Sequence, residues 1–233
     1  MIYSYIILAI FISWIWVDYY RLIDIYHKNH LKYFAGTFLI GGLSVLLTLG
    51  VYDYIWEPLG FELNGNLWND ILYNFVGIGL NEELCKLACF LIAFLLFRKR
   101  FVEPIDYVAY FCTTALGFAA VENVMYFYGY GAKIIEGRAI LSTVGHMIDS
   151  AIIAYGIIRI KFHPKEPKPW TIIWFILLAA VSHGFYDFWL LFEATKSVGW
   201  VITTIFFLFL ISVFASIINN ALNNSSYFTY KKV

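Results

Sequence analysis

Long apolar runs separated by short clusters of charge constrain this chain more than any other feature. A helix needs about 20 mainly apolar residues to cross a bilayer, and seven runs approach or exceed that length. Only 14% of the residues are charged, against roughly 25% in soluble domains. The sequence therefore predicts an all-α, polytopic membrane bundle of about seven transmembrane helices. The predicted spans are residues 2–17, 31–51, 68–97, 105–128, 139–160, 170–192 and 198–218.

Short loops and the lack of an internal repeat predict one membrane domain over residues 1–233, with candidate active-site helices at about 68–192. Strands are not expected, because open sheet edges cannot face lipid. The net charge of zero gives no sign of a nucleic-acid partner, so the expected surrounding is the lipid bilayer. The first apolar run has no basic start and no small-residue cleavage site, and is interpreted as an uncleaved span.

The distribution of lysine and arginine predicts the orientation. One set of alternate loops carries twelve of these residues, and the other set carries only Lys133, Arg138 and Lys196. Because cytoplasmic loops are enriched in Lys and Arg, the N-terminus is predicted outside and the C-terminus in the cytoplasm. Three cysteines lie inside apolar runs and are interpreted as small packing residues: Cys85, Cys89 and Cys112.

Ionisable side chains occur inside four of the predicted spans, where each costs a few kcal/mol or more. At a rise of about 1.5 Å per residue, they lie roughly 20–25 Å from the cytoplasmic ends of their spans. Four antiparallel spans therefore place their polar groups in one layer, in the outer part of the bilayer. The layer contains Asn81, Glu82, Glu83, Lys86, Glu122, Asn123, His146, Asp149, His183 and Asp187.

Local spacing indicates how these groups can interact. Lys86 projects between Glu82 and Glu83 around the helix, so it can pair with either carboxylate. Two adjacent carboxylates repel each other, and one ammonium fully neutralises only one of them, which suits a general base or acid. His183 and Asp187 are four residues apart, so the carboxylate can orient the imidazole.

Structural interpretations of single residues remain open at this point. Glu122 can bond Tyr126 four residues on, and Asp149 can serve His146 three residues before it. A glycine directly beside each histidine, at 145 and 184, predicts close approach of a helix or of a substrate backbone. Three functions of other classes also remain: a proton-coupled transporter using the layer as a relay, a non-catalytic membrane sensor or scaffold, and a bis-histidine haem protein.

Four motifs follow one another along the predicted spans. They are Glu82-Glu83-Leu84-Cys85-Lys86 (EExxK), Phe118-Ala119-Ala120-Val121-Glu122-Asn123 (FAxxEN), His146 after a small residue, and His183-Gly184-Phe185-Tyr186-Asp187 (HxxxD). In this order they resemble the PrsW family of bacterial intramembrane proteases, which is related to the CAAX prenyl endopeptidases. The resemblance covers about residues 69–192. The CAAX relatives have His at the position of Glu122 and often Asn at that of Asp187.

The resemblance implies a site-1-type endopeptidase of a bacterial cytoplasmic membrane. It implies a single-pass membrane substrate of the anti-sigma-factor class, and a site centred on Glu82, Glu83, His146 and His183. No cofactor is required on the preferred interpretation. Zinc is the alternative, because two histidines with Glu82 or Glu122 can hold it with an open position, although the HExxH spacing is absent.

The preferred mechanism is peptide hydrolysis by an activated water. One of the two adjacent glutamates takes the proton, and the two histidines donate to the oxyanion or to the leaving amine. The remaining site residues are expected to assist: Asp187 orients His183, Glu122 shapes the cavity and Lys86 tunes the carboxylate pair. A site in the outer layer predicts a cut in the outer juxtamembrane part of the substrate, where unwinding a helix end loses few hydrogen bonds.

Overall fold

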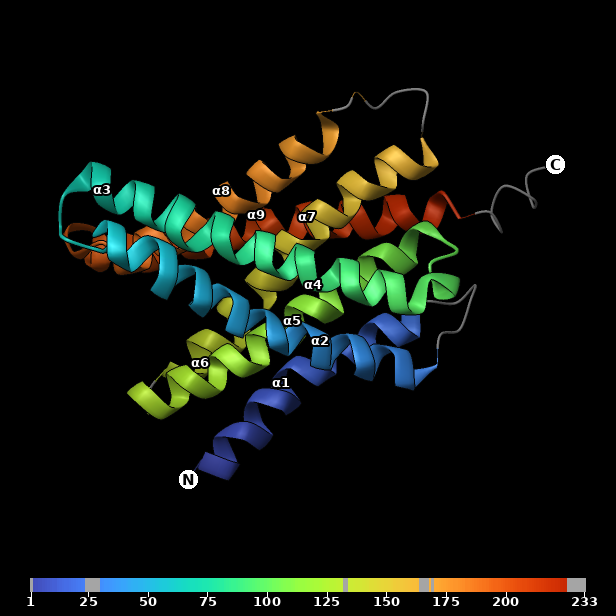
Figure 1. The fold of residues 1–233 in the computed structure, drawn as a ribbon, viewed down its shortest axis with the longest axis horizontal. Coiled ribbons are helices and arrows are strands. Elements are labelled where there is room, and N and C mark those ends of the chain that lie inside the picture. Colours follow the sequence, from blue (N-terminus) through green and yellow to red (C-terminus); the bar gives the residue numbers. More distant parts are fainter. Residues whose placement is uncertain (1, 24–29, 132–133, 164–167, 169, 226–233) are drawn as a thin grey trace.

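The computed structural model describes residues 2–23, 30–131, 134–163, 168 and 170–225, apart from the side chains of 136, 139 and 196. Within these ranges the regular structure is entirely helical (Figure 1). Three segments are π-helical: η1 (Tyr52–Trp56), η3 (Tyr73–Leu80) and η6 (Arg138–Ser142). Three short 3-10 turns are η2 (Glu57–Leu59), η4 (Arg98–Arg100) and η7 (Glu193–Thr195). The α-helices α1 to α9 are Ile2–Ile23, Leu31–Val51, Leu67–Leu72, Asn81–Phe97, Pro104–Tyr130, Ile135–Gly137, Thr143–Phe162, Thr171–Leu191 and Lys196–Asn223.

Within the described residues, six helical stretches are long and apolar enough to cross a membrane, and they correspond to six of the seven predicted spans. They are Ile2–Ile23, Leu31–Leu59, Pro104–Tyr130, Ile140–Phe162, Thr171–Leu191 and Ser197–Asn223. The first is longer than the predicted 2–17. The remaining predicted span, 68–97, is helical throughout as α3, η3 and α4, but Glu82, Glu83 and Lys86 in its middle make it too charged to count with the six. The chain is therefore a helical, polytopic membrane protein.

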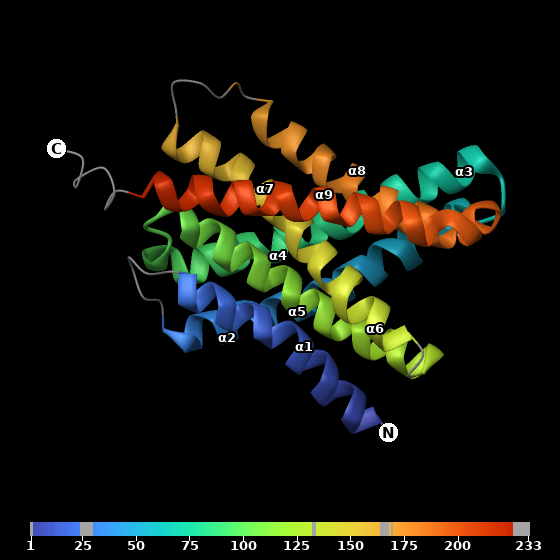
Figure 2. The ribbon, with the colours of Figure 1, turned by 180° about the vertical axis from the view of Figure 1, so that it is seen from behind.

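The long helix α5 lies at the centre of the bundle, where α1, α2, α4 and α7 pack around it (Figures 1 and 2). Pro104 at its start and a reciprocal capping box between Glu103 and Asp106 fix its first turn. Gly131, with φ 75°, ends it. Nearly all side chains from Pro104 to Ala120 are buried against the neighbouring helices, so α5 presents its motif from a rigid support.

The orientation of the chain is still a prediction. Several of the basic residues on which it rests lie outside the described residues: Lys28, Lys133, Lys165, Lys231 and Lys232. The three cysteines are free and buried among packed helices.

Candidate active site

The four motif helices bring all seven predicted site residues into one continuous cluster. Each is within 3.9 Å of another through a hydrogen bond or an ion pair. Glu82, Glu83 and Lys86 come from α4, Glu122 from α5, His146 from α7, and His183 and Asp187 from α8. These seven side chains, which the sequence places at a similar depth, therefore meet within the bundle; their depth in the bilayer is still a prediction.

Lys86 is the hub of the cluster and is completely buried. Its Nζ lies 2.8 Å from Glu83 Oε1 and 3.3 Å from Glu82 Oε2, so it pairs with both carboxylates. It also lies 3.0 Å from His146 Nδ1. The Phe118 ring, which begins the FAxxEN motif, lies 4.2 Å from Nζ and edge-on to His146. One aromatic side chain therefore supports both the ammonium and the imidazole.

Glu83 and His183 form a buried pair, of which Glu83 is fully enclosed and His183 also borders a cavity. Glu83 has no exposed surface, and its Oε1 lies 3.0 Å from His183 Nδ1. Ser150 donates to the other oxygen, Oε2, over 3.3 Å. Asp149 lies 3.9 Å from His183 Nδ1, so it faces His183 rather than the His146 partner considered from spacing. On the far side of the ring, Asp187 Oδ2 lies 3.3 Å from Nε2, as the four-residue spacing predicts.

Close backbone packing explains how His183 reaches Glu83. A methyl group added to Gly184 would lie 2.6 Å from Phe75 Cα, and one added to Gly79 would lie 2.6 Å from the Ala180 carbonyl oxygen. Helix α8 therefore lies backbone against backbone on the π-helical segment η3, as predicted for the glycine beside His183. Gly145, beside the other histidine, differs: a methyl group there meets nothing within 4 Å, because this position borders a cavity.

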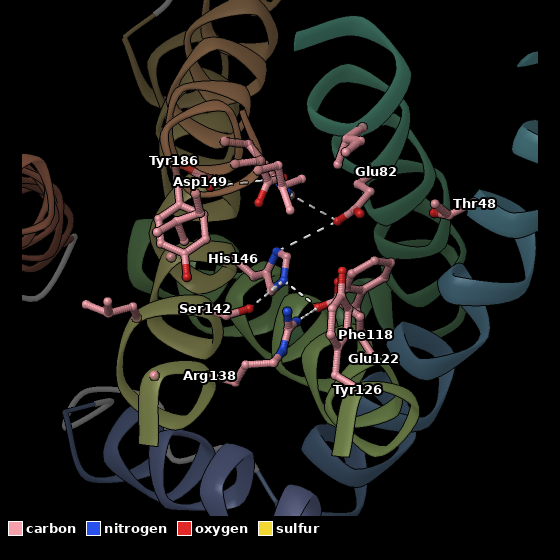
Figure 3. A pocket seen from close by; sticks show the side chains of 18 of the residues that line it. Thr48, Glu82, Phe118, Glu122, Tyr126, Arg138, Ser142, His146, Asp149 and Tyr186 are labelled. Atoms are coloured by element: carbon pink, nitrogen blue, oxygen red, sulfur yellow. Dashed lines mark hydrogen bonds and ion pairs between the residues drawn. The ribbon is translucent and has the colours of Figure 1, made fainter. Parts of the chain in front are cut away.

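A cavity of about 660 Å³ opens onto the cluster. Glu82, Glu122 and His146 point into it from three different helices (Figure 3). Its walls do not include Glu83 or Lys86. Between the two adjacent glutamates, therefore, it is Glu82 that a substrate or a water molecule in the cavity can reach. Other wall residues come from the helix ends that are predicted to be extracytoplasmic: Tyr52, Tyr130, Ile134, Leu191 and Trp200.

Glu122 and His146 form a second pair, which borders the cavity together with Glu82, His183 and Asp187. His146 Nε2 lies 2.9 Å from Glu122 Oε2 and 3.3 Å from the Ser142 hydroxyl. Arg138 donates to the same oxygen of Glu122, and its guanidinium stacks 3.7 Å from the centre of the Tyr126 ring. Glu122 thus bonds Arg138 and His146, and not Tyr126 as the spacing alone had suggested.

The donor set fits a zinc ion in type and arrangement. Ligand atoms of Glu82, His146 and His183 all lie within 4.8 Å of one another. Each histidine turns one ring nitrogen toward Glu82 Oε2, at 3.9 and 3.5 Å, and the other toward a second carboxylate. That carboxylate–histidine pairing is the usual support of metal-binding imidazoles. Among the described residues the set contains Glu82 rather than Glu122, and Lys86 is the group that would compete for His146 Nδ1. A second set, Glu83, Asp149 and His183, shares His183.

Sequence reasoning missed Arg138, Ser142 and Ser150 as members of this cluster, because Arg138 was counted as a loop charge and serines are common in helices. A signal was nevertheless present. Together with His146 these residues repeat every four positions, at 138, 142, 146 and 150, which places them on one helical face.

Most of this sequence is similar to that of known proteins. The family model described as "PrsW family intramembrane metalloprotease" matches residues 29–217. The chain is 29% identical over 192 residues to "Protease PrsW" of Clostridioides difficile, covering 80% of this chain and 78% of the relative. It is 31% identical over 176 residues to "Protease PrsW" of Geobacillus kaustophilus, covering 75% and 74%. The comparison with solved structures found no match. On the family match, and with the four motifs gathered in one buried cluster, this chain belongs to the PrsW family of intramembrane proteases.

Proposed function

We propose that this protein hydrolyses a peptide bond of a single-pass membrane protein near the extracytoplasmic face, using a water molecule activated by Glu82. One observation carries the assignment of the base. Glu82 lines the cavity, and its Oε2 lies 3.3 Å from Lys86 Nζ, 3.9 Å from His146 Nδ1 and 3.5 Å from His183 Nε2. Its neighbour Glu83 is enclosed and holds Lys86 and His183 in place.

Side chains of this protein can carry out each proton transfer of the reaction. Glu82 takes a proton from water as the water oxygen bonds to the carbonyl carbon, and returns it to the amide nitrogen as the C–N bond breaks. His183 lies beside Glu82 with Nε2 on the cavity side, so a hydrogen on Nε2 can stabilise the oxyanion. Carboxylates on both sides of the ring, Glu83 and Asp187, supply counter-charge for it.

Zinc, when bound, would be held by Glu82, His146 and His183 and would activate the water as a Lewis acid. We propose that the Glu82 carboxylate activates the water without a metal, because the Lys86 ammonium lies against His146 Nδ1. We therefore expect purified protein in proteoliposomes to keep cleaving a single-pass substrate after treatment with a chelator. Cleavage that stops in chelator and returns with zinc would instead assign these three side chains as metal ligands.

The position of the cut follows from the position of the cluster. Helix α7 continues for 16 residues beyond His146, which is about 24 Å of helix, and its basic end is predicted to be cytoplasmic. The cavity opens among the opposite helix ends. We expect mass spectrometry of both fragments to place the cut in the outer juxtamembrane segment or the first outer turns of the substrate. A cut on the cytoplasmic side of the substrate's midpoint would contradict the proposal.

The expected substrate class is an anti-sigma factor, and the expected location is the bacterial cytoplasmic membrane. Both follow from the family's resemblance and not from the geometry. A test compares cleavage of candidate single-pass proteins by the wild type and by Glu82→Gln in the same vesicles. A protein that is cut equally by both is not a substrate of this site.

A further inference from the structure

Arg138 lies at the start of the π-helical segment that leads into α7, two residues before the apolar stretch Ile140–Phe162. Its guanidinium lines the cavity instead of extending into solvent, and its side chain is only 16% exposed. An arginine stays charged in a protein and loses hydration when it is enclosed. Its enclosure therefore needs compensating contacts, and their geometry shows what it can do.

Three contacts anchor the guanidinium on α5. It donates to Glu122 Oε2, its Nε donates to Asn123 Oδ1 over 2.8 Å, and its plane stacks on the Tyr126 ring. Two of these partners are the final residues of the FAxxEN motif. The planar guanidinium suits such a forked contact, whereas an ammonium is a single point of charge.

A second connection ties the backbone of Arg138 to the same place. Thr143 donates its hydroxyl to the Arg138 carbonyl over 3.0 Å, and Asn123 donates to the Thr143 hydroxyl over 2.9 Å. The start of α7 is thus closed onto α5 by a ring of hydrogen bonds. Glu122 is held on one side by this ring, and its other contact is the His146 imidazole.

The shared oxygen of Glu122 decides the state of the imidazole. A carboxylate accepts hydrogen bonds and donates none, so Nε2 of His146 carries the hydrogen in the 2.9 Å contact. Nδ1 then has a free lone pair, which lies 3.0 Å from Lys86 Nζ and can accept from it. Without its arginine, Glu122 would be free to turn away, and both tautomers of the ring would become accessible.

We propose that Arg138 is a positioning residue: acting through Glu122, it fixes the orientation and the tautomer of the His146 ring. This inference rests on the proposed function for its effect on rate, because His146 Nδ1 lies 3.9 Å from Glu82, the proposed base, and 3.0 Å from Lys86. Arg138 does not itself reach the reacting atoms, because its donors are directed to Glu122 and Asn123.

The test is a double-mutant cycle between Arg138→Ala and Glu122→Gln, measured as kcat and KM on a single-pass substrate in proteoliposomes. Small displacements of supporting groups can cost on the order of 100-fold in rate, so we expect Arg138→Ala to lower kcat by about that factor with KM little changed. Because both residues act on one ring, the double variant should be no slower than Glu122→Gln alone. Arg138→Lys, which keeps the charge but not the fork, should be intermediate.

Arg100 provides a matched control. It also stacks on a tyrosine ring, with Cζ 4.5 Å from the centre of the Tyr33 ring, and its Nη2 donates to the Tyr33 hydroxyl over 3.0 Å. It lies in η4, just before the start of α5, whereas the partners of Arg138 lie toward the other end of that helix. We expect Arg100→Ala to keep wild-type kcat. If Arg138→Ala fails to accumulate, the same comparison is made with Arg138→Lys.

A second measurement works without any cleavage. Nitrogen-15 shifts of the His146 ring, assigned with His146→Gln, should show one tautomer with Nε2 protonated in the wild type and a mixture in Arg138→Ala. An unchanged kcat, additive losses in the double variant, or one unchanged tautomer would each overturn the inference while the proposed function stands. If the wild type cleaves no substrate, the proposed function fails, and the ring spectra still decide whether Arg138 positions His146.

Discussion

The two histidines of this site are held in different ways. The inner half of the cluster is defined as Glu83, Asp149, Ser150 and His183; Glu83 and Ser150 are enclosed, whereas His183 and Asp149 reach the cavity from the side where α8 lies against η3. The outer half, defined as Glu122, Arg138, Ser142 and His146, borders the cavity. The Glu83 side chain is 0% exposed and that of Glu122 is 15% exposed. Close packing of helices therefore holds the His183 imidazole, whereas a chain of hydrogen bonds through Glu122 holds that of His146. Glu82 lies between the halves and contacts both rings.

The largest expected effect separates the two adjacent glutamates. Glu82→Gln removes the base, so cleavage should fall by roughly 10²- to 10⁴-fold while thermal stability in detergent is retained. Glu83→Gln should also lower cleavage. In addition, it removes the negative charge that lies closest to the buried Lys86 ammonium, 2.8 Å away. Breaking such a buried pair costs about 3 kcal/mol, which a thermal unfolding midpoint would record. If Glu83→Gln is as stable as the wild type and Glu82→Gln is not, the roles of the two glutamates have been assigned the wrong way round.

A smaller effect should distinguish the two glycines beside the histidines. Gly184→Ala forces a methyl group against the backbone of η3, and overpacking of this kind costs about 1–3 kcal/mol. Gly145→Ala is the matched control, because its methyl group meets open space. We expect Gly145→Ala to unfold at the wild-type temperature but to raise KM, since the methyl group enters the cavity. Equal destabilisation by both changes would contradict the contrast between packed and open halves.

The smallest effect concerns two serines, Ser142 at the end of η6 and Ser150 in α7. Ser150 donates to Glu83 inside the packed half, so Ser150→Ala leaves a buried acceptor short of one bond and should cost about 1 kcal/mol. Ser142 lies against His146 at the cavity, where water can replace its hydroxyl, so Ser142→Ala should leave stability unchanged. Thermal unfolding of the two variants, side by side, measures the difference. A larger loss from Ser142→Ala would show that the outer half is closed to water.

Residue spacing predicted the members of the cluster because helical geometry is regular. Lys86 lies between its two carboxylates, and Asp187 lies beside His183. The rise and rotation per residue of an α-helix already specify both positions. The common depth of the four motifs followed from the same geometry. The spans were predictable because a bilayer demands apolar length, and only the charged segment around Glu82 departs from that pattern.

Spacing could not show which of two adjacent glutamates faces the cavity. That depends on how α8 packs on η3, which is set by contacts between segments about a hundred residues apart. It also could not place Arg138, since a basic residue just outside a span is ordinarily a loop charge. Here the π-helical start of α7 and the ring of hydrogen bonds through Thr143 turn it inward.

The π-helical segments ahead of α4 and α7 have a consequence for insertions and deletions. A π turn holds one more residue than the α turn that it replaces, so η3 and η6 each store surplus length directly before a motif. Deleting one residue there would let a plain α-helix form and would swing everything upstream by about 100°. In η6, such a deletion would turn Arg138 away from Glu122 although every letter of the four motifs was intact. A relative that preserves the motifs but lacks a residue in η6 would therefore carry the family's signature without the contact between Arg138 and Glu122.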